Sequence, residues 1–547
     1  MSTTPEPPEP ADPTSSTDPA PARQRRTSVL VGALVGLLVL AVVAAGFAGW
    51  SLTSGDDPEA PATSPGTTPR TPSPTASGPE PGTDPELARF YAQEVRWQDC
   101  GRAECGRLTV PLDYEAPDAT TIELAVLKVP AQDDQARVGA LVVNPGGPGG
   151  SGVNYAAAGS LQFGRPLSQA FDIVGFDPRG VGQSSTLECL TTGQLDTLVA
   201  FDPDPDDLAE RNDMDRLIHG FGQGCLDRSG DITRHMSTRE VVRDLDILRA
   251  ALDEPKLHYL GASYGTLIGA TYADMFPDRV GRFVLDGAID PSLSNEELTL
   301  SQAGGFETAL RAYVKDCVDR GGCFLGDSVD EGTRRIRDLL DQIERQPLPT
   351  DTDRDLTVGT ATLGVWLPLY LKEYWPQLTA GLQQAMDDRR GSALLGLADL
   401  YTSRGPSGYT DNSIEALYAV NCLDHNDFIP TSEVPSHFAE FEKVSPTFGR
   451  AFAFGLSTCS SWPVKSGQRT TALHAAGAAP IVVIGTTRDP ATPLAWAQAM
   501  AAQLESGRLI TRDGDGHTGF QRGNDCVDDA VETWLIDGDA PPPNLMC

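Results

Sequence analysis

Basic residues are scarce in this chain of 547 residues. Lys and Arg total 42 against 76 Asp and Glu, which gives a formal net charge of −34. Nucleic-acid binding needs a basic footprint to meet the phosphates, so the composition argues against nucleic acid as a partner. It also argues against broad adhesion to anionic lipid surfaces. The content of 40% apolar and 22% charged residues is nevertheless typical of a globular protein.

Metal-binding patterns are also missing. There are only 7 His and no Cys-x-x-Cys, so a zinc site is not expected. The 10 Cys are an even number, which suits disulfides in an oxidising, extracytoplasmic compartment, where a catalytic thiol is not expected. Connectivity does not follow from the sequence alone. The spacing suggests five sequential pairs: Cys100–Cys105, Cys189–Cys225, Cys317–Cys323, Cys422–Cys459 and Cys526–Cys547.

Charge is absent from residues 28–50, near the N-terminus. At about 1.5 Å per residue this segment spans roughly 34 Å as a helix, which is enough to cross a bilayer. Arg23, Arg25 and Arg26 precede it and predict a signal-anchor whose N-terminus stays in the cytoplasm. A cleaved signal peptide is the alternative, although its apolar region is usually shorter. No Cys follows the span closely, which argues against a lipoprotein.

Pro, Ser and Thr dominate the stretches on either side of this apolar segment. Residues 1–27 cannot bury a core and are expected to form a disordered cytoplasmic tail. Residues 51–86 are expected to form an extended stalk that holds a catalytic body away from the membrane. The folded body is therefore expected over residues 87–547.

Apolar runs along the body predict the strands of an α/β fold. They alternate with helical patterns such as Thr238–Leu252, which indicates a mostly parallel sheet with helices on both faces. Residues 291–478 interrupt the alternation and are expected to form a large helical cap, inserted between core residues 87–290 and 479–547. The predicted strands are Thr121–Val129, Gly139–Asn144, Phe171–Phe176, Leu257–Leu260, Arg282–Leu285, Pro480–Ile484 and Gly507–Thr511.

The main chemical signal is the Gly-x-Ser-x-Gly pattern at residues 261–265. A serine hydroxyl is a weak nucleophile until a base takes its proton and a tight turn presents it. This pattern supplies the turn, provided that it follows a strand and opens a helix, as the sequence predicts here. Ser263 is therefore the predicted nucleophile. The pentapeptide alone is a weak signal, and an ordinary structural turn is the alternative reading.

A glycine-rich loop, Asn-Pro-Gly-Gly-Pro-Gly-Gly-Ser-Gly at residues 144–152, follows an earlier strand. Such a loop can direct backbone N–H groups at developing negative charge. In an α/β-hydrolase one N–H of the oxyanion hole comes from this kind of loop and another from the residue after the nucleophile. Gly146, Gly147 and Tyr264 are the predicted donors. A flexible turn is the alternative; a phosphate loop is disfavoured because no Gly-Lys-Ser/Thr follows.

Two C-terminal loops carry the residues that can activate the serine. Asp489 and His517 each follow a predicted strand, and the order Ser263, Asp489, His517 is that of the α/β-hydrolases. The carboxylate orients the imidazole, which acts as general base and then general acid. Asp515, close to His517, is interpreted as a turn residue. The rivals are Asp286 and Asp290 as the carboxylate, and His258, His425 and His474 as the base.

Together these motifs resemble the secreted bacterial tripeptidyl aminopeptidases of the α/β-hydrolase fold, which are related to proline iminopeptidases. The resemblance covers about residues 90–547 and implies the same triad and a family C-terminal region at about residues 440–547. These relatives are often released, whereas this chain has a predicted anchor. The resemblance rests on the motifs NPGGPGGSG, DPRGVGQS (177–184), GASYG, NCLD (421–424), Cys459 with SWP (461–463), DPATP (489–493) and GDGHTGF (514–520).

The resulting hypothesis is a membrane-anchored, extracytoplasmic serine aminopeptidase that releases short, tripeptide-type N-terminal peptides without metal or organic cofactor. Processing could also release it from the membrane, which it is expected to meet only through the N-terminal helix. An exopeptidase must bind the free ammonium group of its substrate, for which Asp424 is the first candidate and Glu307 the second. Each could instead be an ordinary surface carboxylate. The alternatives are an esterase or lipase acting on cell-envelope or xenobiotic esters, and a non-catalytic envelope protein.

Overall fold

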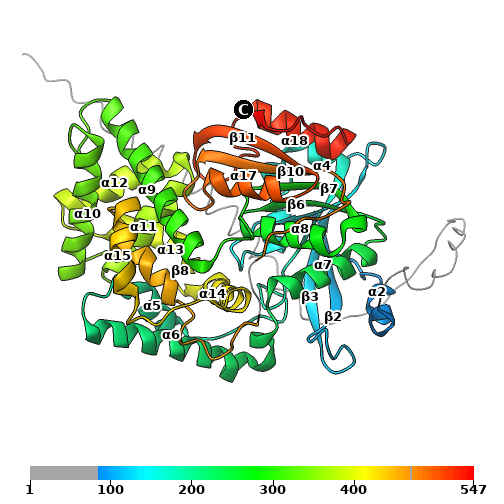
Figure 1. Ribbon diagram of the computed structural model, residues 1–547, viewed down its shortest axis with the longest axis horizontal. Helices are drawn as coiled ribbons and strands as arrows, with labels where there is room; N and C mark the ends of the chain where they lie inside the picture. The colour runs from blue at the N-terminus through cyan, green and yellow to red at the C-terminus, as the bar shows by residue number, and fades with distance from the viewer. Residues whose placement is uncertain (1–83, 468–470) are drawn as a thin grey trace, which may run out of the picture. The chain divides into compact units, whose positions relative to one another are not determined.

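The computed structural model describes residues 84–467 and 471–547 (Figure 1). The predicted tail and signal-anchor, and nearly all of the predicted stalk, lie outside the described residues. Within the described ranges, no helix is both long and apolar enough to cross a bilayer.

A large twisted sheet organises the described body, which contains ten strands in the order β1-β2-β3-β5-β4-β6-β7-β10-β11-β12. The first strands pair antiparallel up to β5, and from β5 to β12 every pairing is parallel. This confirms the predicted, mostly parallel α/β-hydrolase sheet. The strands are β1 (Gln98–Asp99), β2 (Glu104–Pro111), β3 (Thr121–Val129), β4 (Gly139–Asn144), β5 (Phe171–Phe176), β6 (Leu257–Ala262), β7 (Val280–Asp286), β10 (Ile481–Arg488), β11 (Gly507–Asp515) and β12 (Leu545–Met546).

The central strands consist of apolar residues because helices cover both faces of the sheet. One face packs against α3 (Gly152–Ala157), α4 (Ser160–Ala170) and α18 (Asp525–Asp537) through an apolar cluster that includes Phe163 and Trp534. The other face packs against α7, α8 and α17 through a second cluster that includes Leu245 and Ile268. These three helices are α7 (Thr238–Ala251), α8 (Tyr264–Met275) and α17 (Leu494–Gln503).

Between β7 and β10, where the cap is predicted, the chain forms helices that mostly share an apolar core of their own, whereas the helix at residues 413–424 packs into the main core cluster. Figure 1 shows this helical layer beside the carboxyl ends of the parallel strands, with α5 (Thr192–Ala200) and α6 (Leu208–Ser229) beneath it. Arg404 of the cap pairs with Asp196 of α5, with 2.6 Å between Nε and Oδ1. The cap helices are α9 (Asn295–Asp319), α10 (Val329–Arg345), α11 (Val358–Tyr370), α12 (Trp375–Asp387), α13 (Ser392–Tyr401), α14 (Ser413–Asp424), α15 (Phe438–Val444) and α16 (Gly449–Ala453).

Every described cysteine lies in a disulfide. The five bonds of the described body are the pairs that the spacing suggests: Cys100–Cys105, Cys189–Cys225, Cys317–Cys323, Cys422–Cys459 and Cys526–Cys547. Disulfides persist in oxidising compartments, so they indicate an extracytoplasmic or secreted protein.

Candidate active site

Ser263 lies in the sharp turn between β6 and α8. Its backbone has φ 54° and ψ −124°, a left-handed conformation that is strained for a residue with a side chain. The flanking glycines make the turn possible, because a Cβ on Gly261 would lie 2.4 Å from the Gly265 carbonyl oxygen. The Ser263 N–H donates to the carbonyl of Asp286 on the neighbouring strand over 2.8 Å. The half-buried hydroxyl is therefore presented at the carboxyl end of the sheet.

The glycine-rich loop after β4 lies directly against this turn. A Cβ on Gly146 would come within 2.8 Å of the Tyr264 nitrogen and 2.9 Å of the Ser263 Cβ. Only a bare backbone fits this closely, and Gly146 has a φ of 90° and Gly147 a φ of 114°. The loop therefore brings its peptide groups to the place where an oxyanion would form.

The three predicted oxyanion donors are not equivalent in the structure. The Gly146 N–H donates to Asn144 Oδ1 over 2.9 Å, so this donor is already occupied. Within the described residues the Gly147 N–H has no acceptor. Tyr264 is the first residue of α8, where an N–H has no intrahelical acceptor. Of the three predicted donors, Gly147 and Tyr264 thus have N–H groups without an acceptor among the described residues, whereas the Gly146 N–H is engaged.

His517 and Asp489 meet across the ends of β11 and β10. His517 Nδ1 lies 2.9 Å from both carboxylate oxygens of Asp489. The carboxylate is buried and also accepts from the backbone N–H groups of Ala491 and Thr492, each over 2.9 Å, and of Thr518 over 3.1 Å. These bonds fix the carboxylate and, through it, the plane and tautomer of the imidazole ring.

The other ring nitrogen of His517 is left without a partner. His517 Nε2 is buried and has no hydrogen-bond partner among the described residues. With Nδ1 donating to Asp489, Nε2 carries the lone pair and can accept a proton. No hydrogen bond joins it to the Ser263 hydroxyl in the described structure. Such contacts are often loose without substrate and tighten in the reacting complex.

Asp286, the main rival of Asp489, has a different task. Its carboxylate accepts from the backbone N–H groups of Gly519 over 2.8 Å and Phe520 over 2.9 Å. Burial raises the pKa of this carboxyl to about 6. Asp286 therefore holds the loop that follows His517 and does not contact the imidazole nitrogens.

Three of the remaining rivals, Asp290, His474 and His258, also have structural partners. Asp290 accepts from Ser292, and the ring of His474 lies 3.4 Å from the Gln503 carbonyl oxygen. His258 accepts from the Arg282 N–H over 3.1 Å, near the amino end of β6, and burial lowers its pKa to about 4. The structure brings none of them to the His517 position.

Asp424, the first candidate for binding a substrate amino group, takes part in an internal network. Its Oδ1 accepts from the Thr238 N–H over 2.8 Å and its Oδ2 from the Thr238 hydroxyl over 2.5 Å. The same hydroxyl lies 2.5 Å from the phenol oxygen of Tyr264. Burial raises the pKa of Asp424 to about 7. The carboxylate thus connects the start of α7 with the side chain next to the nucleophile.

Glu307, the second candidate, is buried in the cap. Its carboxylate accepts from the Ser445 hydroxyl over 3.2 Å and from the Thr447 N–H over 3.1 Å. No cationic side chain of the described residues forms an ion pair with it. Glu307 therefore joins α9 to the segment that precedes α16.

The cap contacts three loops of the site, namely the glycine-rich loop and those of Asp489 and His517. A Cβ on Gly305 of α9 would lie 2.5 Å from the Pro490 carbonyl oxygen, and one on Gly149 would lie 2.5 Å from the Ser413 carbonyl oxygen of α14. The backbone N–H of His517 donates to the Tyr370 carbonyl, at the end of α11, over 2.8 Å. Cap and core thus share one site.

Sequence reasoning did not identify three residues that support the site. The Thr492 hydroxyl donates to Asp489 Oδ2 over 3.0 Å and lies 3.3 Å from His517 Nδ1. The Tyr370 ring meets the imidazole edge-on, with 5.5 Å between ring centroids, and Thr238 holds Tyr264. Thr492 lies within the Asp-Pro-Ala-Thr-Pro motif and could have been found there. No sequence motif around Tyr370 or Thr238 indicates that these residues support the site.

The sheet order, the strained serine turn and the Asp–His pair define an α/β-hydrolase of the serine hydrolase class. Residues 445–547 match the family model described as TAP-like protein, close to the predicted region 440–547. The chain belongs to this TAP-like family of hydrolytic enzymes, as its identity to curated relatives over most of its length shows.

Three relatives illustrate the range of names in the family. The chain is 37% identical to the serine protease Hip1 of Mycobacterium tuberculosis, over 83% of this chain and 91% of that protein. It is 36% identical to carboxylesterase B of the same species, over 84% and 91% respectively. It is 31% identical to the tripeptidyl aminopeptidase of Streptomyces coelicolor, over 84% and 87%.

Proposed function

We propose that the protein is an extracytoplasmic serine aminopeptidase that releases short N-terminal peptides, with Ser263 as nucleophile, His517 as general base and acid, and Asp489 as the residue that orients His517. The observation that carries the proposal is the imidazole, held at Nδ1 by both oxygens of Asp489 while Nε2 has no partner among the described residues. The relatives named serine protease and tripeptidyl aminopeptidase support a peptide substrate.

The mechanism follows from these positions. His517 Nε2 takes the Ser263 proton as Oγ attacks the carbonyl carbon, and the N–H groups of Gly147 and Tyr264 stabilise the oxyanion. Collapse of the tetrahedral intermediate forms an acyl-enzyme as the imidazolium protonates the leaving amine. Water, activated by the same imidazole, then releases the acyl group and restores Ser263.

A second candidate is an esterase that uses the same residues. It is favoured by the engagement of both predicted amine-binding carboxylates, Asp424 and Glu307, in internal hydrogen bonds. The relative named carboxylesterase B points the same way. The aminopeptidase proposal therefore requires a substrate ammonium group to compete for one of these carboxylates.

One comparison separates the two candidates. Full-length protein is assayed with a free tripeptidyl anilide, its N-acetylated twin and a short-chain nitrophenyl ester, and Ser263→Ala is the control. An aminopeptidase cleaves the free tripeptide and loses turnover on acetylation. Ester cleavage without anilide cleavage identifies an esterase, and equal rates on free and acetylated peptides overturn the exopeptidase proposal.

We also propose that residues 28–50 anchor the protein in the membrane with its body outside the cytoplasm. The uncharged segment and the three preceding arginines support this orientation. Fractionation with N-terminal sequencing tests it: an anchor leaves the intact N-terminus in the membrane fraction, whereas a cleaved signal peptide leaves a shortened, released chain.

A further inference from the structure

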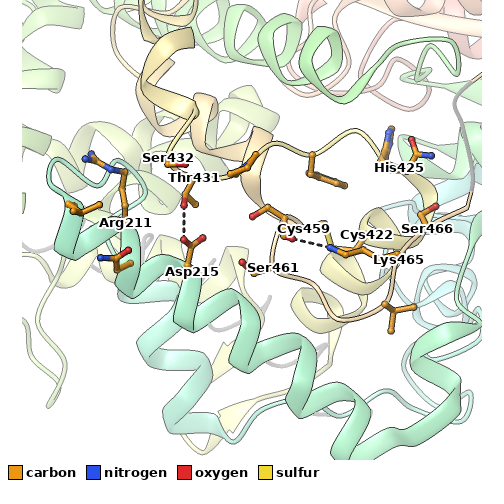
Figure 2. Close-up of a pocket in the computed structure, with 17 residues that line it drawn as sticks. Arg211, Asp215, Cys422, His425, Thr431, Ser432, Cys459, Ser461, Lys465 and Ser466 are labelled. Carbon is orange, nitrogen blue, oxygen red and sulfur yellow. Dashed lines mark hydrogen bonds between the residues drawn. A yellow bond between two sulfur atoms is a disulfide. The ribbon is translucent and has the colours of Figure 1, made fainter.

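A cavity of about 610 Å³ lies between α6 and two segments of the cap, the one after α14 and the loop after Cys459 (Figure 2). The Cys422–Cys459 disulfide contributes to its lining. Ser263, Asp489 and His517 do not line it. Its volume falls within the range of about 300 to 1,000 Å³ that is typical of ligand sites. It is therefore large enough for a ligand of several residues.

Two cationic side chains that line this cavity have no carboxylate partner. Arg211 donates to the carbonyl oxygens of Pro205 and Asp206, and Lys465 Nζ donates to the Ser460 carbonyl over 3.0 Å. Neither forms an ion pair within the part of the chain that the structure describes. In a chain with a net charge of −34, where acids outnumber bases, such cations remain available for an external anion.

Most of the other polar side chains of the cavity can donate hydrogen bonds, although the hydroxyls and amides can also accept them. His425 Nδ1 is buried without a hydrogen-bond partner among the described residues, because Asp427 Oδ1 is 4.0 Å away. Hydroxyl groups of Ser432 and Ser461 also line the cavity. Among the described lining residues only Asp215 is a carboxylate, and it accepts from the Thr431 hydroxyl over 2.7 Å. A donor-rich cavity suits a ligand rich in acceptors.

The cations stand apart from one another. Figure 2 shows Arg211 on α6 at one side of the cavity and Lys465 on the loop at the other, with Asp215 and the serine hydroxyls between them. A single small anion can contact one cation only, whereas an extended chain with two carboxylates can contact both. Peptide carbonyl groups along that chain can accept from the hydroxyls.

We propose that this cavity is a binding site for an acidic peptide segment, with one carboxylate at Arg211 and a second at Lys465. The site is separate from the catalytic residues and does not depend on the reaction at Ser263. Charge-assisted hydrogen bonds fix the two ends, and the apolar side chains of Phe428 and Val464 contact the methylene groups of the peptide.

Binding is tested with full-length protein carrying Ser263→Ala, so that no turnover occurs. The probe is a fluorescent hexapeptide, acetylated and amidated, with glutamates at its second and fifth positions, and the readout is fluorescence anisotropy. We expect saturable binding of one peptide per chain. Arg211→Gln and Lys465→Gln should each weaken it about tenfold, as expected for loss of a charge-assisted bond.

Two controls separate this site from general charge effects and from misfolding. Arg228→Gln removes a cation from the same helix but outside the cavity, and should leave the affinity unchanged. Asp215→Asn removes the single lining carboxylate and should tighten binding about threefold, a gain that misfolding cannot produce.

Four results would overturn the proposal. They are the absence of saturable binding, equal affinity for the glutamine twin of the peptide, an effect of Arg228→Gln as large as that of Arg211→Gln, and citrate or inorganic phosphate binding as tightly as the peptide. The last result would identify a small-anion site instead.

Discussion

The two sides of the active site use the same kind of support for different purposes. On one side Asp489 accepts from backbone N–H groups and from the Thr492 hydroxyl, and holds His517. On the other side Asp424 accepts from the N–H and hydroxyl of Thr238, which holds Tyr264. Asp489 has a partner that can become cationic during the reaction, whereas Asp424 has only neutral donors. Asp489 is therefore expected to stabilise the charge of His517, whereas Asp424 is expected only to hold Tyr264 in position.

The largest fall in activity is expected when a group that transfers the proton is removed. Ser263→Ala and His517→Ala should each lower kcat/KM by about 10⁴-fold or more, as for other serine hydrolases. Hydrolysis of the tripeptidyl anilide and the nitrophenyl ester by the wild type and both variants measures kcat/KM, with thermal unfolding as a check of the fold. Near-normal turnover in either variant would refute the assigned roles.

The comparison of the two carboxylates is sharpened by Asp489→Asn and Asp424→Asn. Asparagine at position 489 cannot stabilise the imidazolium, so kcat should fall about 10³- to 10⁴-fold. At position 424 only the placement of Tyr264 is weakened, and we expect a fall of about tenfold in kcat with little change in KM. Equal losses at both positions would mean that Asp424 contacts the reacting groups or the substrate.

A smaller effect is expected for Tyr264→Phe. The backbone N–H remains, but the phenol contact with Thr238 is lost while Thr238 stays bonded to Asp424. We expect kcat to fall about three- to tenfold at constant KM, because the donor is held less firmly. Double-mutant analysis with Thr238→Val checks the link: the losses should be less than additive, and full additivity would contradict it.

The smallest effect concerns stability. Burial raises the pKa of Asp424 to about 7, above the value of about 3.9 expected in the unfolded chain. The folded state therefore retains a proton that the unfolded state loses between about pH 4 and pH 7, so raising the pH across this window lowers stability. The stability advantage of the wild type over Asp424→Asn should shrink across the same window. Denaturant unfolding at several pH values measures it, and a constant difference would contradict it.

Most strands and the sharp turn that holds Ser263 could be predicted because their signals are local. Ser263 has a glycine two residues away on either side, and His517 lies in a glycine-rich loop that follows an apolar run. The polar end of β11 was missed, since Arg512 and Asp515 do not look like strand residues and extend it only by pairing with β10.

Contacts between distant parts of the chain could not be predicted. Thr238 and Asp424 are separated by 186 residues, and no sequence pattern in either segment predicts their hydrogen bond. The sequence therefore suggested Asp424 as an amine-binding group from its place in the predicted cap beside a suggested disulfide, without knowledge of its internal partner. The association of α5 and α6 with the cap could not be predicted for the same reason, because both helices precede β6 and are far from the cap in the chain.

The contact of Gly305 with the Pro490 carbonyl limits how freely the two parts of this enzyme can be exchanged. A cap taken from a relative would also need a glycine at this position of its first helix, since even a methyl group there would displace the loop that carries Asp489. Substrate preference and catalytic competence are therefore not modular properties in this architecture. Chimeras that exchange only the cap should therefore require a glycine where the cap meets the Asp489 loop, even though each parent protein is stable by itself.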